Sequence, residues 1–225
     1  MPYFSHEGVQ LFYRQKGGGQ LLLILHGNTA SSAVHGGELD YFGQQYCATA
    51  LDAPGCGQSQ RIAQWPADWW RAYAHCAHAL GDHLGNSDCL VVGTSGGATA
   101  ALWLAALYPA QVRAVIADSF VPRHDPARLR HEVHVGRAQR LPGQIAFWQQ
   151  SHGADWEQVI AADNALLLAL AETGGAFLQG CPLEAIQCPV LLTASRGDDL
   201  LPANTSLQLV ELAEQLQDGR LYLHP

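Results

Sequence analysis

The sequence predicts an α/β fold, with a mainly parallel sheet covered by helices on both faces. Short apolar runs alternate with longer amphipathic stretches, the pattern of parallel strands joined by crossover helices. The run Leu21–Leu25 is apolar at every position, as expected of a strand buried on both faces. A chain of 225 residues also suits one such domain with a full core, so we treat residues 1–225 as a single domain.

Each element follows from a local pattern. The first expected strand ends at a run of three glycines, and the small-residue helix after Gly97 ends at Tyr108-Pro109. The expected helix at 69–84 places apolar side chains on one side at helical spacing. In chain order, strands are expected at 9–15, 21–25, 47–51, 89–92, 112–117, 190–194 and 220–223, and helices at 69–84, 98–107 and 204–217.

The alternation of strand and helix lapses between Phe120 and Cys188. Three segments there have helical character, at 128–140, 145–150 and 155–173, and they are separated by Pro142-Gly143 and by Gly153. We interpret residues 121–187 as a helical lid inserted within the domain.

Composition excludes several classes of protein. A hydrophobic fraction of 48% with 14% charged residues is typical of a globular interior and argues against a disordered chain. The net charge of −8, with no basic stripe, argues against a nucleic-acid partner. No secretory signal or membrane-length apolar run is visible, and the six cysteines include no C-x-x-C pair. We therefore expect a cytoplasmic monomer or homodimer with free thiols and no membrane partner.

The pentapeptide Gly93-Thr94-Ser95-Gly96-Gly97 carries the strongest chemical signal. It follows an expected strand and precedes an expected helix, which is the context that a G-x-S-x-G nucleophile turn requires. Small neighbours allow the strained turn, and Ser95 is then presented at the head of the helix. There the amide of Gly96 can stabilise developing negative charge.

A second motif, His26-Gly27-Asn28, lies at the end of the buried strand Leu21–Leu25. The backbone N–H of Asn28 can face that of Gly96 and complete an oxyanion hole. We interpret His26 as a structural histidine under this loop, in preference to a catalytic base.

These two motifs, with Asp52-Ala53-Pro54-Gly55-Cys56-Gly57-Gln58-Ser59 between them, resemble the α/β-hydrolase superfamily. The resemblance runs from Val9 to Leu223 and includes the position of the lid after the sixth strand. It implies an α/β-hydrolase fold with seven or eight strands. It says little about the substrate, because this scaffold serves many chemistries.

The resemblance also selects the catalytic acid. In the family the acid follows the seventh strand, four residues before a proline such as Pro202, which points to Asp198. Asp199 is the alternative, although it could instead cap the next helix.

The family's base lies in a loop after the last strand, and this sequence ends Leu221-Tyr222-Leu223-His224-Pro225. By register His224 closes that strand, so we expect the catalytic histidine a few residues beyond Pro225. Two alternatives remain: His224 has taken over the role, or the protein is not a competent triad enzyme.

Other histidines, tryptophans and one cysteine could also have functional roles, and we weighed each of them. The pairs His75/His78 and His131/His134 lack a carboxylate-rich metal motif, so we expect surface or packing roles and no metal. The tryptophans at 65, 69 and 70 are expected to pack in the core or against the lid. Trp148 and Trp156 are candidates for lining a substrate pocket, and Cys56 is expected to be exposed enough to react.

The sequence thus predicts a serine hydrolase that cleaves a small carboxylic ester through an acyl-enzyme on Ser95, with no cofactor. A C–C hydrolase or lyase using the same triad is the first alternative. A non-catalytic ligand-binding member or fragment is the second. An aspartate nucleophile, as in the epoxide hydrolases and haloalkane dehalogenases of the superfamily, is excluded by Ser95.

Overall fold

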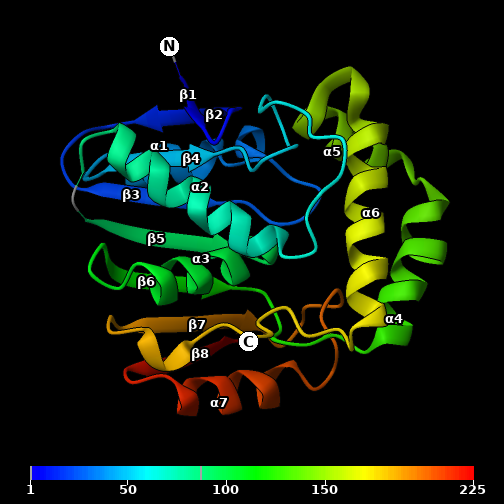
Figure 1. The fold of residues 1–225 in the computed structure, drawn as a ribbon. Helices are drawn as coiled ribbons and strands as arrows, with labels where there is room; N and C mark the ends of the chain where they lie inside the picture. The colour runs from blue at the N-terminus through cyan, green and yellow to red at the C-terminus, as the bar shows by residue number, and fades with distance from the viewer. Residues whose placement is uncertain (1, 87) are drawn as a thin grey trace.

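A computed structural model describes residues 2–86 and 88–225, which form one eight-stranded sheet (Figure 1). The strand order is β1-β2-β4-β3-β5-β6-β7-β8. Pairing is antiparallel from β1 to β2 and from β2 to β4, and parallel across the rest of the sheet. The strands are β1 (Tyr3–His6), β2 (Val9–Lys16), β3 (Leu21–Leu25), β4 (Cys47–Leu51), β5 (Cys89–Thr94), β6 (Val112–Asp118), β7 (Val190–Ser195) and β8 (Gly219–His224).

Helices cover both faces, because neighbouring residues of a strand point to opposite sides of the sheet. Leu23 of β3 packs in the larger core with α2 (Trp69–His83) and α3 (Gly96–Leu107). Its neighbours Leu22 and Ile24 pack on the other face, against Leu39 of α1 (Gly36–Phe42). The last helix, α7 (Thr205–Gln215), packs against β8. The mixed α/β fold with helices on both faces is thereby confirmed.

Between β6 and β7 the chain forms the helices of the insertion (residues 121–187), which stand to the right of the sheet in Figure 1. They are α4 (Pro126–His131), continued by a π-helical turn at Glu132–Gly136, then α5 (Pro142–His152) and α6 (Trp156–Glu172). The expected helical segments are therefore present. That they act as a lid stays a prediction.

Two elements were missed in the sequence. Strand β1 has four residues of mixed polarity and no apolar run, and it joins β2 through the tight turn Glu7-Gly8, where both residues have positive φ. Helix α1 begins with Gly36-Gly37, two poor helix formers that hide its pattern. In the part of the chain that the structure describes, no helix is both long and apolar enough to cross a membrane.

Candidate active site

Ser95 occupies a strained turn between β5 and α3. Its backbone has φ 55° and ψ −121°, a conformation that costs free energy in a residue other than glycine and is common at functional sites. A side chain at Gly93 would overlap the carbonyl of Gly97, and one at Gly97 would overlap the carbonyl of Leu25. The predicted small neighbours are thus a steric requirement, and the predicted strand–turn–helix context of Ser95 is present.

The loop after β3 lies directly against this serine. A Cβ added to Gly27 would stand 3.0 Å from the Cβ of Ser95, a tight contact, so glycine at this position eases the close approach of the two backbones. Gly96 is the first residue of α3, and its N–H has no acceptor within the helix. Asn28, Ser95 and Gly96 all line one cavity, as the prediction of an oxyanion hole requires.

His26 lies beneath this loop and is fully buried. Its Nδ1 donates to the carbonyl of Gly27 at 2.8 Å, and its Nε2 accepts from the N–H of Ala53 at 3.0 Å. Burial lowers the pKa of His26 to about 3, so the ring stays neutral and both nitrogens are engaged. This environment fits the structural role expected from the sequence.

The predicted acid, Asp198, lies in the loop after β7, and it lines the same cavity as Ser95. Its Oδ1 accepts a hydrogen bond from the N–H of Leu200 at 2.9 Å. Asp199 is exposed and does not line the cavity. The expectation that Asp199 caps the next helix is wrong, because the residue that precedes α7 is Asn204.

His224 does not line the cavity. It is the last residue of β8, is exposed and pairs in register with Ser195, and its ring lies edge-on to Tyr222 at 4.7 Å between centroids. Among the residues that the structure describes, the histidine lining the cavity is His124, which sequence reasoning did not select.

His124 follows β6 and contributes to the cavity wall. Its Nδ1 is buried with no hydrogen-bond partner among the described residues, and its ring lies edge-on to Phe177. Burial and the nearby Arg128 guanidinium lower the pKa of His124 to about 4. A buried nitrogen without a hydrogen-bond partner is uncommon in folded proteins.

The cavity measures about 610 Å³, the size range of small-molecule sites. Trp148 lines it, as predicted, whereas Trp156 stacks behind Trp148 at 5.3 Å between centroids and does not line it. The lining comes from the segments that follow β3, β5, β6 and β7 and from the insertion. The insertion supplies apolar and charged side chains together: Arg128, Leu129, Glu132, Arg137, Phe147, Trp148, Leu167 and Phe177.

Comparison with known proteins places this arrangement in a family. Residues 20–141, which include β3 to β6 and the turn at Ser95, match the model described as the alpha/beta hydrolase fold. The chain belongs to the α/β-hydrolase family.

One named relative is also a hydrolase. A 2-(acetamidomethylene)succinate hydrolase of Mesorhizobium japonicum is 34% identical over 116 residues, which are 51% of this chain and 40% of that protein. The matched segment therefore spans less than half of the relative's length.

Solved structures agree on the fold. The enol-lactonase from Burkholderia xenovorans superposes with a TM-score of 0.73 at 16% identity, covering 99% of this chain and 90% of that one. An E-2-(acetamidomethylene)succinate hydrolase superposes with a TM-score of 0.72 at 21% identity, covering 99% and 91%.

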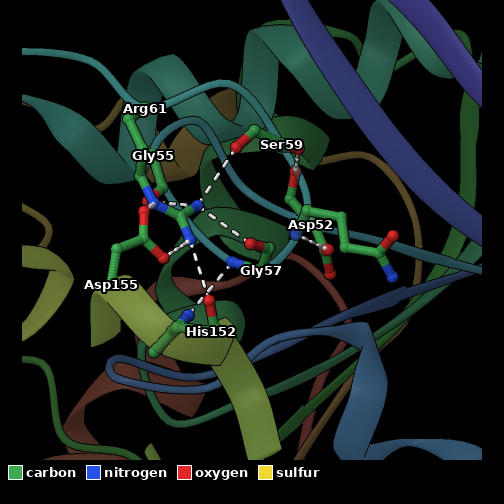
Figure 2. A network of polar contacts seen from close by, with 8 residues as sticks. Asp52, Gly55, Gly57, Ser59, Arg61, His152 and Asp155 are labelled. Atoms are coloured by element: carbon green, nitrogen blue, oxygen red, sulfur yellow. Dashed lines mark hydrogen bonds and ion pairs between the residues drawn. The ribbon is translucent and has the colours of Figure 1, made fainter. Parts of the chain in front are cut away.

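In this α/β hydrolase the insertion is fastened to the loop after β4 by Arg61 (Figure 2). The guanidinium binds the carboxylate of Asp155 through two nitrogens, each at 2.8 Å, and donates to the carbonyl of His152 at 3.0 Å. It also donates to three carbonyl groups of its own loop, those of Gly55, Gly57 and Ser59. One side chain thus orders the loop and holds the corner between α5 and α6.

His152 extends this connection to the loop beside Ser95. Its Nδ1 accepts from the N–H of Gly57 at 3.0 Å, and its Nε2 donates to the carbonyl of Thr29 at 3.1 Å. Burial lowers the pKa of His152 to about 4, which keeps Nδ1 free to accept. No local pattern indicates this role, because the residues that His152 bonds lie 95 and 123 positions away in the chain.

The expectation that Cys56 is reactive is wrong. Cys56 is fully buried in the loop after β4, and burial raises the pKa of its thiol well above the usual value. The loop closes inward around the buried carboxylate of Asp52, which accepts from the N–H groups of Ser32 and Gln58. The tryptophans expected to pack in the core or against the lid, Trp65, Trp69 and Trp70, are buried.

Proposed function

We propose that this α/β hydrolase is a serine hydrolase in which Ser95 attacks the carbonyl carbon of a small substrate. The observation that carries the proposal is the strained turn that presents Ser95 at the head of α3, in a cavity shared with Asn28, Gly96 and Asp198. Backbone strain of this kind is common at active sites, where the surrounding structure holds the strained residue in place.

The proposed reaction requires a histidine base in addition to Ser95 and Asp198. Ser95 gives its proton to a histidine base as its oxygen attacks, and Asp198 orients that histidine and stabilises its charged form. The backbone N–H groups of Asn28 and Gly96 stabilise the oxyanion, a contribution of about 3 kcal/mol for each donor. The leaving group takes the proton, and water then hydrolyses the acyl-enzyme.

The proposed substrate is a small carboxylic ester. Phe147, Trp148, Leu167 and Phe177 give the cavity apolar walls that suit a compact organic group. A lactone or a C–C bond substrate would use the same serine, and the named relatives act on an enol-lactone and on a succinate derivative. The same cavity could also serve a ligand-binding protein without turnover.

Arg128 favours a substrate that carries a carboxylate. Its guanidinium lines the cavity and donates to the carbonyl of Leu200 at 2.7 Å, and no carboxylate among the described residues forms an ion pair with it. Its remaining N–H donors can bind an anionic group in the planar geometry that carboxylates prefer.

A pair of esters of similar length tests both parts of the proposal. We expect the protein to hydrolyse p-nitrophenyl butyrate and mono-p-nitrophenyl succinate, and Ser95→Ala to abolish both activities. Arg128→Gln should raise KM for the succinate ester about tenfold, since a charge-assisted hydrogen bond contributes roughly 1.5 to 3 kcal/mol, and leave KM for the butyrate ester unchanged. Turnover equal in Ser95→Ala would refute the serine mechanism. Binding without turnover would favour the ligand-binding alternative.

A further inference from the structure

Asp163 is a buried carboxylate for which the proposed reaction has no use. It lies in the middle of α6, within the insertion, and its side chain is fully buried. Taking an ionised carboxylate out of water is costly unless it is paired and fully hydrogen-bonded. Its partners therefore indicate what keeps it there.

One partner of Asp163 belongs to the loop beside the nucleophile. The Nδ2 of Asn28 donates to Asp163 Oδ1 at 2.5 Å. The two residues are 135 positions apart in the chain, and Asn28 is the residue whose backbone N–H we assign to the oxyanion hole. The insertion thus contacts the oxyanion hole through one specific hydrogen bond.

The side chain of Asn28 is held at its other end as well. The Nε1 of Trp70 donates to Asn28 Oδ1 at 3.3 Å. The same oxygen fills the space that a side chain at Gly96 would need, so it also packs against the second oxyanion donor. With both ends of the amide engaged, the side chain of Asn28 has one orientation, and its backbone N–H is directed accordingly.

Arg137 balances the charge of this arrangement. Its Nη1 donates to Asp163 Oδ2 at 2.5 Å and to Asn164 Oδ1 at 2.8 Å, and its side chain is 10% exposed. An uncompensated carboxylate this close to the oxyanion hole would oppose the negative charge that develops there. The ion pair with Arg137 offsets this repulsion through Asp163 Oδ2, and Asp163 Oδ1 accepts the hydrogen bond from Asn28.

We propose, on the basis of the proposed serine mechanism, that Asp163 is a positioning residue: through the side chain of Asn28 it fixes the direction of the oxyanion-hole N–H. The insertion is then part of the catalytic apparatus as well as a wall of the cavity. The alternative is that Asp163 and Arg137 only hold the insertion together.

Backbone hydrogen exchange measures the positioning without turnover. In Asp163→Asn the isosteric amide no longer offers a charged acceptor. Exchange at residues 27–30, where the N–H of Ala30 donates to the carbonyl of Gly27, should therefore rise about tenfold while exchange along α6 stays close to wild type. Arg130→Ala is the matched control, because it removes the exposed ion pair with Glu172 elsewhere on the insertion and should leave residues 27–30 unchanged. Unchanged exchange at 27–30, or an equal rise along α6, would overturn the proposal.

A double-mutant cycle measures the catalytic consequence. Asp163→Asn should lower kcat for p-nitrophenyl butyrate about 10- to 100-fold with little change in KM. This loss of kcat is smaller than the loss expected when an oxyanion-hole donor is removed altogether, because the N–H of Asn28 is only displaced. In the Asn28→Ala background, which keeps the backbone N–H, Asp163→Asn should have no further effect on kcat. An equal loss of kcat in both backgrounds would overturn the proposal. If neither the wild type nor any variant shows turnover that depends on Ser95, the proposed serine mechanism fails. The hydrogen-exchange result alone then decides whether Asp163 positions the loop at residues 27–30.

Discussion

Two sides of the cavity are built differently: the side of Ser95, the proposed nucleophile, and the side of Asp198, the proposed acid, here called the nucleophile side and the acid side. Around Ser95, Gly27 and Gly97 are confined by backbone contacts, and His26 and Asp52 beneath them are buried and fully bonded. The acid side is the loop after β7, where Arg196, Gly197, Asp199 and Leu200 are exposed and Asp198 is half-buried.

This difference indicates where a substitution can change the rate of reaction without changing the stability of the fold. On the nucleophile side the same contacts hold the fold and place the reacting groups, so substitutions there should affect both. On the acid side few side chains are buried, so substitutions should change the rate of reaction and leave the free energy of unfolding nearly unchanged.

The largest expected effect tests the acid side. Asp198→Asn should lower kcat/KM about 10³- to 10⁴-fold, because the amide cannot stabilise a charged histidine base. The melting temperature should stay near that of wild type, since the asparagine Oδ1 can still accept from the N–H of Leu200. Asp199→Asn is the matched control and should keep full activity. If Asp199→Asn is the variant that loses activity, the acid has been assigned to the wrong residue.

The next effect tests the nucleophile side. Gly97→Ala places a methyl group on the carbonyl of Leu25, and the backbone cannot yield, so we expect the free energy of unfolding to fall by at least about 3 kcal/mol. Gly37→Ala, in α1 with open space around it, should instead be neutral or stabilise by about 0.5 to 1 kcal/mol. Urea unfolding at neutral pH measures both, and similar values for the two variants would contradict the steric account.

A smaller effect is expected from the connection between the insertion and the core. Arg61→Met removes the bonds to Asp155 and to four carbonyl groups, and should cost about 2 to 3 kcal/mol of unfolding free energy. Arg130→Met breaks an exposed pair and should cost less than about 0.5 kcal/mol. Limited proteolysis should cut first near the α5–α6 corner in Arg61→Met. Equal costs for the two variants would show that the Arg61 cluster adds no more than a surface ion pair.

The smallest effect is a pH dependence on the nucleophile side. The pKa values of His26 and His152, about 3 and about 4, lie below the ordinary histidine value of about 6.5, so the unfolded chain binds protons that the native state does not. Their contribution to stability is present above pH 6.5 and is lost as pH falls toward the folded pKa values.

Between pH 7 and pH 5.5 these two histidines should together lower the free energy of unfolding by about 2 kcal/mol. Urea midpoints at the two pH values measure this. The variant His152→Gln should lose less stability over the same interval. An unchanged pH dependence in that variant would show that His152 is not neutral in the native state.

Features that depend on neighbouring residues could be predicted from the sequence, and features that depend on distant contacts could not. The apolar runs at β3 and β4 fix those strands at their observed bounds, and the glycines around Ser95 predict its turn because the steric demand is local. The sequence did not predict which residues of the insertion contact the loops after β3 and β4.

Local patterns cannot show the hydrogen bonds of Asp163, Arg61 and His152, because each joins side chains or loops far apart in the chain. The burial of Cys56 also depends on distant contacts. A position in a glycine-rich loop predicts exposure, whereas the loop is drawn inward by contacts to Asp52 and His152. His124 belongs to no sequence motif, and its place in the cavity wall is known only from the folded structure.

The central claim is that Ser95 is the nucleophile, and covalent labelling tests it most directly. A fluorophosphonate reacts with an activated serine, and mass spectrometry of the digested protein locates the adduct. We predict one adduct, on Ser95, and no labelling of a folded Ser95→Ala variant. A main adduct on another residue, or equal labelling of the Ser95→Ala variant, would contradict the account.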